Sequence, residues 1–114
     1  MSRKGRVSAA ALRDSAPVFA ALGDETRLRL VARLSQGGPQ SIARLTEGQP
    51  VTRQAITKHL RVLAEAGLAR DLRHGRERRW ELERRRLDHA RRCLDLVSRE
   101  WDESLARLKA FVED

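Results

Sequence analysis

The fold can be predicted from one stretch of the sequence, Gln54-Ala55-Ile56-Thr57-Lys58-His59-Leu60-Arg61-Val62-Leu63-Ala64-Glu65-Ala66-Gly67-Leu68. On a helical wheel, one sector of this stretch is apolar and contains Ile56, Leu60, Leu63 and Ala64. The opposite side is polar and contains Gln54, Thr57, Lys58, Arg61 and Glu65. Thr52 is a suitable N-cap and Gly67 a suitable C-terminal stop. The pattern therefore predicts an amphipathic helix from about Arg53 to Ala66.

Three further helices are expected upstream, over about residues 8–22, 24–36 and 41–46. Asp24 and Ser41 are suitable N-caps for the second and the third of them. Pro17 lies inside the first pattern, so that helix is either kinked or begins afresh at Pro17. The turn Gly48-Gln49-Pro50 separates the third helix from the amphipathic one.

A hairpin and a long helix are expected downstream. Alternating apolar residues predict strands over 68–73 and 78–82, with residues 74–77 as the loop. A last helix is expected from about residue 87 into residue 112. The predicted fold is mainly α with a small β-hairpin, a dimeric winged helix-turn-helix with five helices and a two-stranded wing. It forms a single domain over residues 8–114, preceded by a basic flexible arm of residues 1–7.

Composition limits the class of protein. The chain has 114 residues and a net charge of +8, which suits one small domain and excludes a two-domain enzyme. The positive charge favours a polyanionic partner, either nucleic acid or an anionic membrane surface. The single cysteine, Cys93, excludes an intrachain disulfide. We identify neither the apolar region of a signal peptide nor a membrane span, so we expect a cytoplasmic protein without a membrane partner.

The polar face of the central helix carries groups that can bind base edges and phosphates in a DNA major groove. We expect bases to be read mainly from its first turn, and phosphates to be bound further along. The basic hairpin tip is suited to flanking backbone or minor groove. The predicted DNA-binding residues are Arg53, Gln54, Thr57, Lys58, Arg61, Arg73, His74, Arg76 and Arg78. The alternatives are an ordinary solvated helix face and an ordinary exposed turn.

Two further side-chain patterns stand out. Leu87, Leu94, Trp101 and Leu108 recur every seven residues, which favours pairing of the last helix with a partner helix over packing on its own domain. The predicted dimer interface is Leu12, Phe19, Leu87, Leu94, Val97, Trp101, Leu105, Leu108 and Phe111. His59 borders the apolar sector, so we expect a packed, hydrogen-bonded histidine, with a base reader or a pH sensor as alternatives.

The sequence resembles the bacterial ArsR/SmtB-type repressors over about residues 18–82. Residues 54–68 resemble their signature helix, and Arg73-His74-Gly75-Arg76 followed by Trp80-Glu81-Leu82 resembles their wing. The stretch of residues 19–30 is similar to the family's opening pattern. The resemblance implies a dimeric, autoregulating repressor that is released from its double-stranded operator DNA by an effector, here unidentified. Thr57, Trp80 and Gln49-Pro50 depart from the usual serine, tyrosine and apolar-glycine turn.

Residues 99–108 resemble a branch of that family without a recognised metal site. Other branches use paired cysteines before the recognition helix, and residues 41–48 contain no cysteine. His89 and Cys93 can share a helix face, but two ligands fall short of a tetrahedral site. We therefore expect no metal and no cofactor. A metal site shared across the dimer, or a disulfide between two copies of Cys93, remains an alternative.

No enzyme site emerges, because the chain lacks a phosphate-binding glycine loop and a nucleophile at motif spacing from a base. Two other functions stay open. One is a winged-helix module that binds protein or structured RNA, and the other is sequence-independent coating of DNA. The polar helix face favours duplex DNA over RNA, whose major groove is too deep and narrow for side chains to read.

Overall fold

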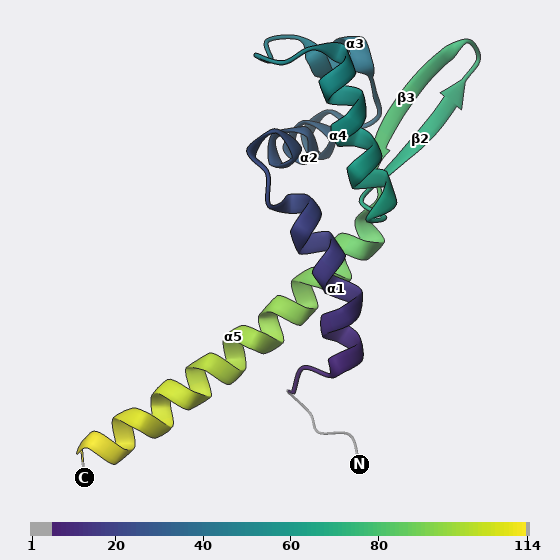
Figure 1. The fold of residues 1–114 in the computed structure, drawn as a ribbon. Coiled ribbons are helices and arrows are strands. Elements are labelled where there is room, and N and C mark those ends of the chain that lie inside the picture. Colours follow the sequence, from purple (N-terminus) through teal and green to yellow (C-terminus); the bar gives the residue numbers. More distant parts are fainter. Residues whose placement is uncertain (1–5, 114) are drawn as a thin grey trace.

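Five helices and a small antiparallel sheet make up residues 6–113, which the computed structural model describes except for the side chain of His74. The elements in chain order are α1 (Ala9–Leu22), α2 (Glu25–Gly37), β1 (Gln40–Ser41), α3 (Ile42–Thr46), α4 (Arg53–Glu65), β2 (Ala69–His74), β3 (Glu77–Leu82) and α5 (Arg84–Glu113) (Figure 1). The predicted winged helix-turn-helix is confirmed. Residues 1–5 of the predicted arm lie outside the described residues, and the Val7 N–H donates to Glu100 Oε1 (3.0 Å).

Short polar side chains begin the first four helices, and for α2, α3 and α4 they are the N-caps that the sequence predicts. In each case a side-chain oxygen accepts a hydrogen bond from the N–H three residues on, which satisfies a backbone donor that the helix leaves free. These N-caps are Ser8 (3.0 Å), Asp24 (3.0 Å), Ser41 (3.2 Å) and Thr52 (3.1 Å). Pro17 lies inside the continuous helix α1. The alternative that a new helix begins at Pro17 is therefore wrong.

The sheet has one more strand than the sequence predicts. Its order is β1-β3-β2, all antiparallel, with Gln40 opposite Trp80 and Ala69 opposite Leu82. The hairpin loop is also shorter than the predicted residues 74–77, because residues 74 and 77 pair with each other. Only Gly75-Arg76 remains as the turn, and Gly75 has a φ of +64°. Glycine in this conformation matches a two-residue turn to the twist of its strands.

The core is aliphatic and lies between the helices and the base of the sheet. Its most completely buried side chains are Val18, Leu30, Leu45, Ile56, Leu60, Leu63 and Leu68. Trp80 joins this cluster from β3, and its indole Nε1 is a buried donor without a hydrogen-bond partner among the described residues. The core therefore ties α1, α2, α3 and α4 to the wing.

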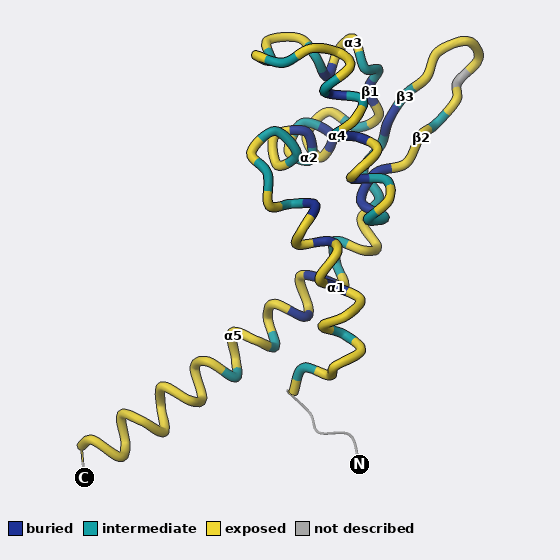
Figure 2. Tube along the Cα trace, viewed as in Figure 1, coloured by how far each residue is buried: buried dark blue, intermediate teal, exposed yellow. Residues whose placement is uncertain are grey.

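Helix α5 begins at Arg84, three residues before the predicted start, and leaves the body of the domain (Figure 2). Ala90 and Cys93 are its buried residues, and the helix is exposed throughout its C-terminal part. The radius of gyration is 18.5 Å, against about 13 Å for a compact chain of this length. The C-terminal part of α5 therefore projects from the domain and does not pack on it. No helix in residues 6–113 is long and apolar enough to span a membrane.

Candidate nucleic-acid interface

Helix α4 presents the polar face that the sequence predicts. Ile56, Leu60 and Leu63 are buried against the core, and this burial turns the other side of the helix to solvent. The exposed polar side chains are Arg53, Gln54, Lys58, Arg61 and Glu65. Thr57 is half-buried, and its hydroxyl donates to Arg53 O (2.9 Å). Because that bond uses the hydroxyl proton, Thr57 can accept a hydrogen bond from a base amino group but has no proton left to donate to a phosphate oxygen.

Arg33 of α2 binds the end of α3, where the turn to α4 begins, and this role was not predicted from the sequence. Its guanidinium donates to three carbonyl oxygens at the end of α3, those of Arg44 (3.1 Å), Leu45 (3.2 Å) and Glu47 (2.8 Å). Two of these contacts satisfy the carbonyls of Leu45 and Glu47 at the end of a five-residue helix, and Arg44 O also accepts from the Glu47 N–H (3.3 Å). They hold the end of α3 next to the turn Gln49-Pro50, where the sequence departs from the family pattern.

The wing carries fewer unpaired cations than its sequence suggests. Ion pairs along the strands join Arg78 Nε to Asp71 Oδ2 (2.8 Å), Arg79 Nη2 to Glu77 Oε2 (3.2 Å), and Arg70 to Glu81. The hydrogen bond from Arg70 to Glu81 raises the pKa of that arginine further above its usual value. Within the described part of the chain, Arg73 and Arg76 have no such pair and are exposed. The free positive charge therefore lies at the tip, where the His74 side chain falls outside the described residues.

The N-terminal end of α4 and the tip of the hairpin extend to the same side of the domain, away from the projecting end of α5 (Figure 1). Most of the predicted DNA-binding side chains lie on these two elements and are exposed. Arg78 is exposed as well, but it differs from the other predicted arginines because Asp71 already binds its guanidinium. Helix α4 and the wing thus point to the same side of the domain, where both can reach a duplex.

Behind α4, the predicted packing of His59 is confirmed. Its side chain is 24% exposed, and Nδ1 lies 3.2 Å from Arg27 Nη1 and 3.8 Å from Asp24 Oδ2. Asp24 also accepts the N-cap hydrogen bond from the Arg27 N–H (3.0 Å). That hydrogen bond is the main reason why the pKa of Asp24 lies below its usual value. Arg27 was not singled out in the sequence, because its partner lies 32 residues away.

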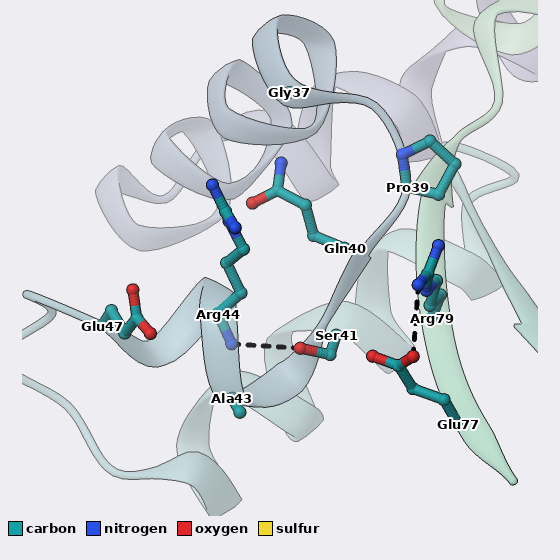
Figure 3. Close-up of a pocket in the computed structure, with 9 residues that line it drawn as sticks. All are labelled: Gly37, Pro39, Gln40, Ser41, Ala43, Arg44, Glu47, Glu77 and Arg79. Carbon is teal, nitrogen blue, oxygen red and sulfur yellow. Dashed lines mark hydrogen bonds and ion pairs between the residues drawn. The ribbon is translucent and has the colours of Figure 1, made fainter.

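A pocket of about 540 Å³ lies between α3, the segment that precedes it, and the first half of strand β3 (Figure 3). Arg44 and Arg79 contribute positive charge to its lining, and Glu47 and Glu77 contribute negative charge. Because Arg79 is paired with Glu77 and both signs are present, this pocket offers no excess charge to a phosphate. The described residues also contain no group of three His, Cys, Asp or Glu side chains that could hold a metal. Cys93 is buried, whereas His89 is exposed.

The residues predicted for a dimer interface form an uncovered apolar stripe. The exposed members are Leu12 and Phe19 on α1 and Leu94, Val97, Trp101, Leu105, Leu108 and Phe111 on α5. Leu87 differs, because it is half-buried and packs on the core of its own chain. The heptad pattern therefore begins to face outward only at Leu94, one heptad later than the sequence predicts. Trp101 and Phe111 are 65% and 81% exposed, unusual values for large apolar side chains.

Comparison with known proteins agrees with this arrangement. A helix-turn-helix domain model matches residues 22–71, from the end of α1 to the start of the wing. The chain is 38% identical over 93 residues to the HTH-type transcriptional regulator Rv2034 of Mycobacterium tuberculosis, covering 82% of this chain and 83% of that protein.

Two solved structures extend the comparison. An ArsR-like transcriptional regulator from Rhodococcus sp. RHA1 is 38% identical with a TM-score of 0.77, covering 90% of this chain and 95% of that one. The homodimeric winged helix-turn-helix domain Mb0332 from Mycobacterium bovis is 25% identical with a TM-score of 0.62, covering 90% and 89%. The chain therefore belongs to the ArsR-like family of winged helix-turn-helix transcriptional regulators.

Proposed function

We propose that this regulator binds a specific operator as a homodimer and represses transcription, including that of its own gene, until an effector releases it. One observation carries the proposal. Arg53, Gln54 and Lys58 are exposed on α4, whose N-terminal end points to the same side of the domain as the wing tip, away from the projecting end of α5 with its apolar stripe (Figure 1). At that tip, Arg73 and Arg76 are exposed and have no ion pair with any other described residue. One end suits DNA and the other suits a second copy.

The residues of α4 divide by their position along the helix. Arg53 and Gln54 are in the first turn, which enters the major groove deepest in a helix-turn-helix, so they read bases. A glutamine amide can bind adenine through two hydrogen bonds, and an arginine can bind guanine in the same way. Lys58 and Arg61, further along, bind phosphates, as do Arg73 and Arg76 of the wing.

The second copy pairs the two α5 helices, with α1 alongside. An exposed stripe of large apolar side chains more than three turns long is costly in water and is removed by pairing. The homodimeric state of the Mycobacterium bovis relative supports this arrangement. Two symmetry-related α4 helices then read half-sites about 34–36 Å apart, or a multiple of that distance.

Repression requires only that the dimer occupy promoter DNA. The exposed cations of α4 and the wing tip, together with the apolar stripe of α5, support such occupancy by a dimer. The effector acts by shifting the dimer away from the arrangement that fits the operator, which needs a difference in its affinity for the two arrangements.

The test begins with selection of duplexes from a random-sequence library by the full-length protein, together with the duplex upstream of its own gene. At an ionic strength of about 0.15 M, the selected duplex should bind about a thousandfold more tightly than its scrambled version. It should contain an inverted repeat, and the protein should block transcription in vitro from its own promoter. Equal affinity for the selected and the scrambled duplex would refute the proposal in favour of sequence-independent coating.

A further inference from the structure

Arg27 connects three parts of the domain that are separate in sequence. Its Nε donates to Ala21 O at the end of α1, and its Nη1 contacts His59 Nδ1 (3.2 Å) in the middle of α4. Its own backbone N–H donates to Asp24, the N-cap of α2. Through this one side chain, the recognition helix is tied to the corner between α1 and α2. Helix α1 carries Leu12 and Phe19 of the apolar stripe, so the link joins the DNA-binding end to the dimer end.

The direction of the hydrogen bond to His59 follows from the chemistry of the guanidinium. An arginine side chain keeps its proton and can only donate. Nδ1 of His59 must therefore be the acceptor, which places the ring proton of the neutral imidazole on Nε2. A protonated imidazole has donors at both nitrogens, so Nδ1 could no longer accept from Arg27.

Protonation would also reverse the electrostatics of the cluster. The charged side chains that face the ring among the described residues are Arg27 and Asp24, while α1 presents only the Ala21 carbonyl to Arg27. On α4 itself, the neighbouring Lys58 is exposed. A positive ring would be repelled by the guanidinium and attracted by the carboxylate 3.8 Å away. The protonated ring of His59 would therefore exchange Arg27 for Asp24 as its partner.

We propose that Arg27 is a positioning residue for operator binding and that its bond to the neutral ring of His59 makes operator recognition sensitive to pH. The neutral ring holds α4 in the orientation that fits the operator. The protonated ring releases Arg27, pairs with Asp24 and lets α4 move relative to α1 and α2. Histidine side chains in general take up a proton between about pH 8 and pH 5. This inference rests on the proposed operator binding.

The test measures the ratio of affinities for the selected duplex and its scrambled version at about pH 8 and about pH 6. The ratio removes the general gain in DNA affinity that added positive charge brings at low pH. For the wild type it should fall about tenfold at the lower pH (about 1.4 kcal/mol). His59→Asn keeps an acceptor near the position of Nδ1 but cannot be protonated, so it should retain the high ratio at both pH values.

Two further variants separate positioning from folding. Arg27→Lys keeps the charge, but one ammonium group cannot replace the forked contacts to Ala21 and His59, so its ratio should be low at both pH values. Arg29→Lys is the matched control on α2, because Arg29 makes only an exposed pair with Glu25 (2.7 Å), and it should behave as wild type. Thermal unfolding by circular dichroism at both pH values identifies any variant whose loss reflects unfolding.

Proton–nitrogen correlation spectra of the wild-type imidazole rings provide a readout without DNA. They should show His59 at about pH 8 with Nδ1 unprotonated. A proton on Nδ1 would overturn the inference, as would the same pH dependence in wild type and His59→Asn. Failure of the library to yield any preferred duplex would instead overturn the proposed function, and the ring spectra would still decide whether the Arg27–His59 bond exists.

Discussion

Gly67 lies beneath the side chain of Arg86, and a Cβ atom at position 67 would lie 2.8 Å from Arg86 Cγ. Gly67 ends α4 with a φ of +78°, and two hydrogen bonds close the helix there, from the Gly67 N–H to Ala64 O (3.0 Å) and from the Leu68 N–H to Leu63 O (2.8 Å). This is a Schellman cap, in which glycine avoids the strain of a left-handed residue. The end of the recognition helix and the start of α5 therefore meet at a residue without a side chain.

Gly67→Ala should lower the free energy of unfolding by more than the conformational strain alone, which is about 1–2 kcal/mol for a left-handed residue. The excess comes from displacing the Arg86 stem. Gly48→Ala is the control, since Gly48 has a similar φ of +72° and nothing within 4 Å of an added Cβ. Urea unfolding of both variants measures the difference. Equal losses at the two positions would show that the contact with Arg86 is immaterial.

Arg33→Ala should destabilise the turn between α3 and α4, because three carbonyl oxygens lose a charged donor. We expect a loss of about 1–3 kcal/mol in the free energy of unfolding. Arg29→Ala removes an exposed arginine from the same helix and should cost less than about 0.5 kcal/mol. Denaturant unfolding gives the two values, and hydrogen exchange should show faster exchange at Glu47 and Gln49 in Arg33→Ala. If the loss of unfolding free energy is no larger than that of Arg29→Ala, the contacts of Arg33 with the end of α3 do not stabilise the protein.

Gln54→Ala and Lys58→Ala should weaken DNA binding in different ways. Loss of a base contact by Gln54 should cost about 1–3 kcal/mol on the selected duplex and relax preference at one base pair. Loss of a phosphate contact by Lys58 should weaken selected and scrambled duplexes alike and reduce the slope of affinity against salt by about one. Lys109→Ala removes the same charge near the far end of α5 and serves as control. Titrations at several salt concentrations would reject this division if both variants change specificity equally.

Leu108→Glu should dissociate the dimer, because its side chain, now 58% exposed, would enter the paired stripe as an unpartnered charge. The variant should sediment as a monomer and lose operator affinity. Arg99→Glu changes an exposed residue on the opposite side of the same helix and should remain dimeric. Analytical ultracentrifugation at micromolar concentration measures both. A wild-type protein that is monomeric while binding its operator tightly would disprove the dimer.

Asp24→Ser should reduce the loss of stability in acid. The pKa of Asp24 is lowered in the folded state, first by the hydrogen bond from the Arg27 N–H and further by the charges of Arg27 and His59, against a desolvation effect that raises it. The unfolded state therefore takes up the proton first, and the stabilisation is present above about pH 4 and is lost as pH falls through the folded pKa. Serine keeps the N-cap but has no such proton to gain.

Melting temperatures at about pH 6 and about pH 3 measure this effect. The decrease between the two should be smaller for Asp24→Ser than for the wild type. Asp95→Ser, which removes an exposed carboxylate from the middle of α5, is the matched control. An unchanged decrease in Asp24→Ser would show that this carboxylate contributes nothing to acid unfolding.

Much of the secondary structure of this protein can be predicted from its sequence, because it depends on interactions between residues that are close in the chain. N-caps and apolar periodicity act within a few residues. The starts of α2, α3 and α4 therefore follow from the caps Asp24, Ser41 and Thr52, and the start of α1 near Ser8 follows from apolar periodicity. The polar face of α4 and the outward stripe of α5 follow from the same periodicity. The roles of individual residues on these faces remain predictions, because a helical wheel shows which side chains are exposed but not which molecule they bind.

The features that depend on contacts between distant segments could be identified only in the folded chain. Strand β1 has two residues and forms because Gln40 meets Trp80 across the sheet. In the sequence, Arg33 and Arg27 look like ordinary cations on a helix surface, yet Arg33 binds backbone carbonyls and Arg27 contacts His59. Arg78 looks like an unpaired cation of the wing, yet it binds Asp71. Hydrogen bonds and ion pairs of this kind depend on where a chain folds back on itself, and side-chain chemistry alone does not state which groups will meet.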